Sequence, residues 1–149
     1  MEADQKTLFK AQIIFWMLGA TDGHAKNFSI RLAPGGRFRL TPLYDVASAQ
    51  PGFNARQIRK NQMKLAMSVG AKRHCVVDTI APRHFLQTAE QCGLPRQFAE
   101  KIIEELRDAG AAEIDRTLRH LPEGFPEAIA ATVAEAAKRR LAQFAPAGD

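Results

Sequence analysis

The order of hydrophobic and polar positions predicts a buried helix near the start of the chain. Apolar side chains recur at helical spacing over residues 6–18, with one face formed by Phe9, Ile13, Trp16 and Met17. Three further apolar residues predict that this helix is buried nearly all round: Ile14, Phe15 and Leu18. Gly19 follows directly and is a residue type at which helices commonly end. A tryptophan in such an apolar run is expected to pack in the core.

An alternating pattern then predicts a β-hairpin. Residues 28–32 and 37–41 alternate apolar and polar side chains, and the Ala-Pro-Gly-Gly sequence of residues 33–36 suits a turn between two strands. Pro42 is expected to end the second strand because it has no N–H to donate. The polar, solvated face of the hairpin is expected to carry Arg31, Arg37 and Arg39.

Helical periodicity returns in the second half of the chain. Residues 47–62 are expected to be irregular and residues 64–70 to form a short strand, and four helices are expected over 82–92, 95–109, 111–120 and 126–143. His84 is interpreted as a structural hydrogen-bonding residue. The basic run at 138–140 is expected to complement the dipole of the last helix. Helices after a small sheet indicate a mainly α (α+β) fold, and the lack of a repeat or linker indicates one domain over residues 1–149.

Composition narrows the class of protein. Hydrophobic residues make up 46% and charged residues 25% of the 149, which is ordinary for a globular domain. The longest apolar run, residues 13–18, is far too short to span a membrane, and Glu2 and Asp4 do not resemble a secretory leader. Cys75 and Cys92 form no metal motif and are expected to be reduced thiols in the cytoplasm. The net charge of +5 favours anionic partners.

Polar and ionisable residues concentrate between the first helix and the hairpin. Asp22 and Asn27 have the Asp-x-x-x-x-Asn spacing of the protein-kinase catalytic loop, in which the Asp accepts a hydroxyl proton and the Asn holds a metal ion. Asp45 lies just beyond the hairpin, so the hairpin is expected to return it to the same place. Mg²⁺ prefers such oxygen ligands. His24 and Lys26 are candidates to meet a transferred phosphoryl group.

These residues also have ordinary structural interpretations. Asp22 suits a turn after a helix or the N-cap of a short turn, and Asp45 suits a cap on the next segment. Asn27 suits a turn or strand-edge amide, and His24 a hydrogen-bonded loop histidine. The spacing alone is weak, because it occurs by chance in many chains.

Longer runs closely resemble the HipA family of bacterial toxin kinases. The matching runs are residues 19–29 (GATDGHAKNFS), 39–49 (RLTPLYDVASA), 64–67 (KLAM), 82–86 (PRHFL) and 121–126 (LPxxFP). The likeness covers nearly the whole chain in order. It implies the carboxy-terminal, catalytic lobe of a serine/threonine kinase-like fold, with a hairpin carrying the catalytic and metal-binding loops.

The resemblance also implies roles and partners. Asp22 corresponds to the catalytic base, with His24 in support. Asn27 and Asp45 correspond to the Mg²⁺ ligands, and His24, Lys26, Asn27 and Asp45 to the residues around ATP. Implied partners are a HipB-like antitoxin, operator DNA mainly through that antitoxin, and a protein substrate of the translation machinery.

One departure from the family supports an alternative function. Family members are far longer, and this sequence has no Gly-rich stretch or paired strand Lys and helix Glu ahead of Asp22, so the amino-terminal ATP-covering lobe is absent. The chain alone is therefore expected to be inactive as a kinase. The alternative is a binding module for an antitoxin or for a complementary kinase half. Direct DNA binding through residues 56–64 and 72–74 is disfavoured, since no helix-turn-helix pattern stands out.

Overall fold

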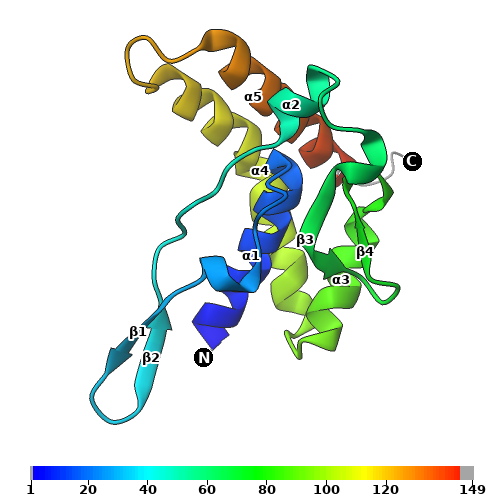
Figure 1. The fold of residues 1–149 in the computed structure, drawn as a ribbon. Coiled ribbons are helices and arrows are strands. Elements are labelled where there is room, and N and C mark those ends of the chain that lie inside the picture. The colour runs from blue at the N-terminus through cyan, green and yellow to red at the C-terminus, as the bar shows by residue number, and fades with distance from the viewer. Residues whose placement is uncertain (1, 145–149) are drawn as a thin grey trace.

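The computed structural model describes residues 2–144 and shows a mainly α fold with two separate antiparallel hairpins (Figure 1). The α-helices in this range are α1 (Glu2–Leu18), α2 (Gln50–Asn54), α3 (Pro82–Gln91), α4 (Arg96–Arg119) and α5 (Glu127–Leu141). The strands are β1 (Ile30–Ala33), β2 (Arg37–Leu40), β3 (Lys64–Val69) and β4 (His74–Val76). Short 3₁₀ turns occupy Ala25–Asn27, Lys60–Gln62, Val77–Thr79 and Ala142–Phe144.

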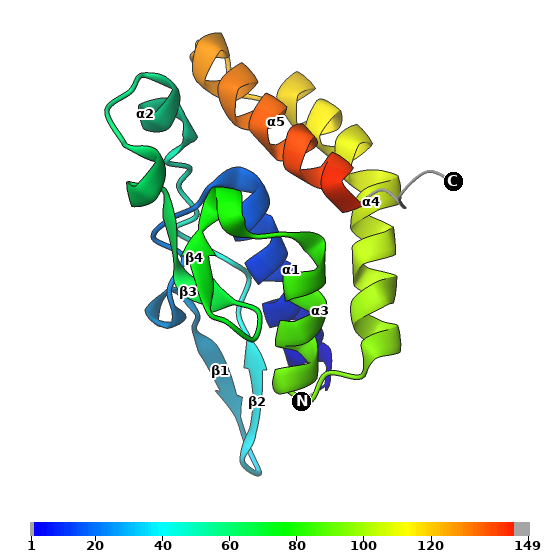
Figure 2. The same cartoon turned by 90° about the vertical axis from the view of Figure 1, so that its right-hand side faces the viewer.

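The core forms around α1, which contacts α4, α5 and β3 (Figures 1 and 2). Trp16 lies at its centre, 1% exposed, with its ring edge-on to Phe85 and Phe144 at centroid distances of 5.4 and 5.7 Å. Its indole N–H donates to the carbonyl of Val77 over 3.0 Å, which satisfies the polar end of a buried ring. The prediction that Trp16 packs in the core is therefore confirmed.

The predicted break between two helices at Gly110 is wrong, because α4 runs unbroken through it. A Cβ at this position would lie 2.8 Å from Cδ2 of Leu141 on α5. Gly110 thus lets α5 approach α4 closely, and the packing of the two helices outweighs the roughly 1 kcal/mol that a glycine costs a helix interior.

Two further expectations are corrected between residues 47 and 76. Residues 47–62 are not simply irregular, since they contain α2 and a 3₁₀ turn. The sequence of α2 begins with Gln-Pro-Gly. This helix was not predicted because Pro and Gly commonly break helices. The basic patch at 72–74 includes the start of β4, which pairs with β3 and was not predicted.

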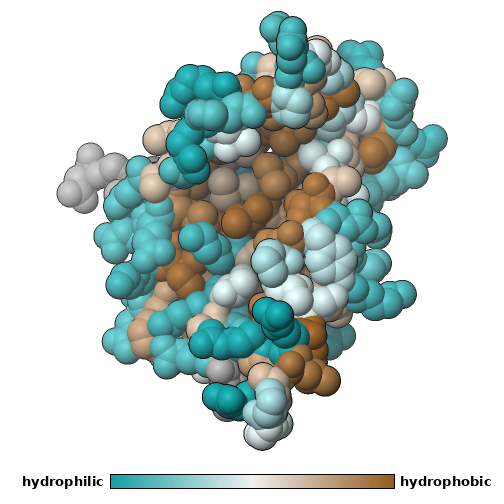
Figure 3. All heavy atoms as spheres, turned by 90° about the vertical axis from the view of Figure 1, so that its left-hand side faces the viewer, coloured by the Kyte–Doolittle hydropathy of each residue, from teal (hydrophilic) through white to brown (hydrophobic). Residues whose placement is uncertain are grey.

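The hairpin predicted over residues 28–32 and 37–41 is observed as β1 and β2, which project from the body of the molecule (Figures 1 and 2). Its pairs alternate between apolar (Ile30 with Leu40, Leu32 with Phe38) and arginine-bearing. Both faces are largely exposed, so the arginines are solvated as expected, and Leu32 is also 76% exposed. On the face shown in Figure 3, apolar surface is concentrated in and around a hollow.

No helix within residues 2–144 combines the length and apolar character that crossing a bilayer requires.

Candidate functional site

The candidate site begins where α1 ends in a Schellman motif. Gly19 adopts a φ of +65°, the left-handed conformation that glycine reaches without steric cost. The Ala20 N–H donates to the Phe15 carbonyl over 2.8 Å, and the Gly19 N–H donates to the Trp16 carbonyl over 3.1 Å. These two bonds define the motif and turn the chain sharply into the polar loop of residues 20–27. The prediction that Gly19 ends the helix is confirmed.

The loop of residues 20–27 packs on a small apolar cluster. Its members are Ala11, Phe15 and Ala20, with Phe28, Leu43 and Met67 packed against them. Gly23 rests directly on the ring of Phe15, because a Cβ there would come within 2.5 Å of the ring atom Cδ2. The backbone between Asp22 and His24 is thereby fixed against the body of the protein.

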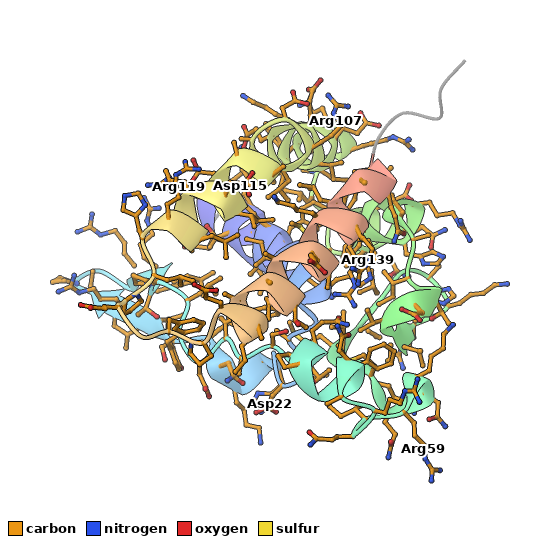
Figure 4. The ribbon with its side chains drawn as sticks, turned by 90° about the horizontal axis from the view of Figure 1, so that it is seen from above. Asp22, Arg59, Arg107, Asp115, Arg119 and Arg139 are labelled. Carbon is orange, nitrogen blue, oxygen red and sulfur yellow. The ribbon has the colours of Figure 1, made fainter. Side chains whose placement is uncertain are left out.

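Asp22 and His24 form the outer part of the site. The Asp22 side chain is 81% exposed and lies at the edge of the molecule in the view from above (Figure 4). Its Oδ1 is 3.7 Å from Nε2 of His24, which makes an ion pair only when the imidazole is protonated. Nδ1 of His24 is buried and has no hydrogen-bond partner among the residues described. An exposed carboxylate beside an imidazole is open to an incoming hydroxyl group.

Asn27 and Asp45 form the inner part. Asn27 is 6% exposed, and its Nδ2 donates to Oδ2 of the exposed Asp45 over 3.1 Å. The side-chain oxygen Oδ1 of Asn27 is buried and accepts no hydrogen bond from any described residue. A buried acceptor left unpaired costs about 1–3 kcal/mol, so this oxygen is in position to take a ligand at little further desolvation. Asp45 has a φ of +55°, which is uncommon outside glycine and is most often seen for Asn and Asp.

The hairpin accounts for this meeting of residues 18 positions apart. At its base the Thr41 N–H donates to the Ser29 carbonyl over 2.9 Å, and the Ser29 and Tyr44 hydroxyls lie 2.7 Å apart. These bonds hold the two arms together just before Asp45. The predicted return of Asp45 is thus observed at Asn27. The predicted approach of Asp45 to Asp22 stays a prediction.

An amide oxygen and a carboxylate suit a Mg²⁺ ion that keeps several waters and phosphate oxygens as its other ligands. Within residues 2–144 no group of three or more His, Cys, Asp or Glu side chains is arranged to hold a metal. The Asn27–Asp45 pair therefore fits a shared Mg²⁺–phosphate site better than an all-protein metal cage. The backbone N–H of Asn27 donates to the carbonyl of His24 over 3.0 Å, but among residues 2–144 no side-chain hydrogen bond or ion pair joins Asn27 or Asp45 to Asp22 or His24. Lys26 is exposed.

Hydrogen bonds join the end of α1 to the segment that follows Asp45, and one residue that makes them, Arg140, was not predicted to lie there. The Ala49 N–H donates to the Gly19 carbonyl over 2.9 Å, and the Ser48 hydroxyl donates to the Leu18 carbonyl. Arg140 was expected only to complement its own helix. It is instead buried and donates to the end of α1 and to Gln50. Its spacing from the buried Ala136 and Ala137 on α5 was the signal that it faces inward.

Two comparisons with known proteins bear on the site. The model of the HipA-like C-terminal domain matches residues 1–114 of the chain. A solved structure titled as the toxin–antitoxin system of Shewanella oneidensis MR-1, with HipA, HipB and its operator DNA, contains a chain of similar fold, with a TM-score of 0.69 and 21% identity. The match covers 93% of this chain and 30% of that one, so this chain spans less than a third of its length.

Proposed function

The chain belongs to the family of HipA-like C-terminal domains, and we propose that it carries the catalytic loop of a HipA-like serine/threonine protein kinase of a toxin–antitoxin system. The observation that carries the proposal is the contact between Asn27 and Asp45, with the unpartnered amide oxygen of Asn27 beside it. A kinase-like catalytic loop needs its Asn and the second Asp at one cation.

In this proposal each residue of the loop has one task. Asp22 accepts the proton of the attacking Ser or Thr hydroxyl, and its exposure leaves it accessible to a protein substrate. Asn27 and Asp45 hold Mg²⁺, which when bound neutralises charge on the phosphate oxygens of ATP. His24 steadies Asp22, and Lys26 supplies a cation at the edge of the site. The ATP-covering lobe is supplied by polypeptide outside this sequence.

The proposed partners follow from the family and from charge. We assign a HipB-like antitoxin as the regulatory partner, operator DNA mainly through that antitoxin, and a protein of the translation machinery in the cytoplasm as substrate. Support comes from the solved structure of similar fold, which is titled as a complex of HipA, HipB and operator DNA. The net charge of +5 is compatible with anionic partners.

Phosphotransfer is tested by joining the chain to the nucleotide-covering half of a HipA relative and measuring autophosphorylation with labelled ATP and Mg²⁺. We expect Asp22→Asn to reduce the rate by about 10²-fold or more, the lower end for removal of a general base. Asp108→Asn, on the exposed face of α4, is the matched control and keeps the rate unchanged. Equal rates for the Asp22→Asn and Asp108→Asn proteins would reject Asp22 as the base.

The binding-module alternative is separated by calorimetry on the chain alone. Titration with ATP·Mg²⁺ gives measurable heat of binding if the loop retains its cation site. Absence of binding by both the chain and the joined protein would favour a role in binding an antitoxin or a kinase half.

A further inference from the structure

Arg140 on α5 is a buried cation without an ion-pair partner in the described structure. The residue is 9% exposed, although it follows Arg139, which is exposed on the same helix (Figure 4). Its Nη1 donates to the carbonyl of Met17 over 2.9 Å, and its Nη2 donates to Oε1 of Gln50 over 2.7 Å. Burial lowers the pKa of this guanidinium from its usual value, partly opposed by the charge of Asp78. Arginine nevertheless stays charged, so the fold holds a desolvated positive charge here.

The end of α1 explains why that charge is tolerated. The carbonyls at the carboxyl end of a helix carry a partial negative charge, and a cation there is stabilised. The last turn of α1 has no basic residue of its own. Arg140 supplies the cation from a position 123 residues later in the chain. A Cβ on Gly19 would lie 3.5 Å from both Nη1 of Arg140 and Oε1 of Gln50, so both side chains lie against the backbone at the turn.

Gln50 connects the same point to the segment that carries Asp45. Gln50 is 1% exposed, its Nε2 donates to Oδ1 of Asn54 over 2.8 Å, and its backbone N–H donates to the Ser48 hydroxyl over 3.1 Å. That hydroxyl donates in turn to the Leu18 carbonyl. The loop with Asp22 and Asn27 leaves this junction on one side, and the segment with Asp45 enters it on the other.

We propose that Arg140 and Gln50 are positioning residues that fix the separation between the loop of residues 20–27 and the segment of residues 45–49. The inference rests on the proposed function and extends it to α5, which lies beyond the residues matched by the family model. If the hydrogen bonds of Arg140 to Met17 and Gln50 are lost, Asn27 and Asp45 are no longer held at a fixed separation. A displacement of about 1 Å costs roughly 10²-fold in rate.

The test compares Arg140→Met, Arg140→Lys and Gln50→Met with the control Arg139→Met in the chain itself. Hydrogen exchange at the Ala49 amide, which bonds to Gly19, reports the junction, and the amide of Ile102 in α4 reports the core. We expect Arg140→Met and Gln50→Met to speed exchange at Ala49 at least tenfold, with little change at Ile102. The Mg²⁺ dissociation constant, followed at the Asn27 side-chain amide, should rise about tenfold in both. Arg140→Lys should recover part of each loss, and Arg139→Met should change neither quantity.

A destabilised core variant separates positioning from general stability. Ile102→Val is measured at a temperature at which its unfolded fraction equals that of Gln50→Met. It should leave the Mg²⁺ affinity unchanged. Mg²⁺ affinity that is unchanged in Gln50→Met, or that falls equally in Ile102→Val, would overturn the inference, and this holds even where Arg140→Met does not fold. Mg²⁺ affinity is measured with ATP present, in the joined protein if the chain alone does not bind. If neither protein binds Mg²⁺ under these conditions, the proposed function fails, and faster exchange at Ala49 would then establish only a structural link between the two segments.

Discussion

Gly23 lies against the ring of Phe15, and this contact makes Gly23→Ala a direct test of how the loop of residues 20–27 is held. The added Cβ would lie 2.5 Å from Cδ2 and 2.8 Å from Cε2 of that ring. Both distances are shorter than any real Cβ contact, so either the loop or the ring must move. Phe15 is 3% exposed and packs against Phe28 at a centroid distance of 5.9 Å, which leaves the ring little space.

Two effects of opposite sign determine how much Gly23→Ala changes the free energy of unfolding. Replacing glycine by alanine stabilises by about 0.4–1 kcal/mol through the unfolded chain where the backbone conformation is compatible. Inserting a methyl group into a packed contact costs about 1–3 kcal/mol. The clash is severe, so we expect the second effect to win, with a net loss of roughly 1–2 kcal/mol. For a chain of this size that loss lowers the melting temperature by about 2–8 °C.

The assay is urea and thermal unfolding followed by circular dichroism, for a double-mutant cycle. Gly23→Ala is measured alone and in a Phe15→Leu background, where the smaller side chain makes room for the methyl group. We expect the cost of Gly23→Ala to fall by at least about 1 kcal/mol in that background, as is usual for residues in contact. Additive effects of the two substitutions would refute the packing of Gly23 on Phe15.

Three further predictions concern the core, α3 and the hairpin. Trp16→Phe removes the indole donor to the Val77 carbonyl, which still accepts the N–H of Ile80, and should lower the free energy of unfolding by about 0.5–1.5 kcal/mol, measured from the urea midpoint; an unchanged midpoint would contradict the bond. Burial lowers the pKa of His84 below its usual 6.5, helped by the nearby charges of His74 and Arg83, and its Nδ1 accepts the N–H of Ala81. The unfolded chain therefore takes up the proton first, so stability should be complete above about pH 6.5 and fall as the pH drops from there towards the lower folded pKa. His84→Gln should flatten that slope, and an unchanged slope would assign it to other groups. Leu32→Thr, at an exposed hairpin position, should change stability by less than about 0.5 kcal/mol, and a larger loss would mean that the chain covers this face.

Local patterns were enough to predict the elements that position the loop of residues 20–27. The apolar run ending at Gly19 and the alternating strands around a Pro-Gly-Gly turn are short-range signals, and both elements occur where they were expected. The approach of Asp45 to Asn27 followed because a hairpin must bring its two ends together. The roles of Asp22, His24 and Lys26 remain predictions, because geometry alone does not assign a proton acceptor.

The parts that were not predicted depend on contacts between residues far apart in the sequence. Gly110 suggested a helix end, and only the nearby side chain of Leu141 on α5 explains why a glycine stands inside a continuous helix. The strand β4 is three residues long and exists because β3 lies beside it. Arg140 belongs to a basic run, and its contacts are with Met17 and Gln50, from which it is separated by 123 and 90 residues.

The central claim is that Asn27 and Asp45 together hold a divalent cation, and a Mg²⁺ titration in the presence of ATP, followed by NMR of side-chain amides, tests it most directly. The amide of the exposed Asn61 serves as an internal control. We predict a saturable shift of the Asn27 amide signal in the unaltered chain, little change at Asn61, and loss of the saturable shift in Asp45→Asn. An Asn27 signal that does not respond to Mg²⁺, or that responds equally in Asp45→Asn, would contradict the account.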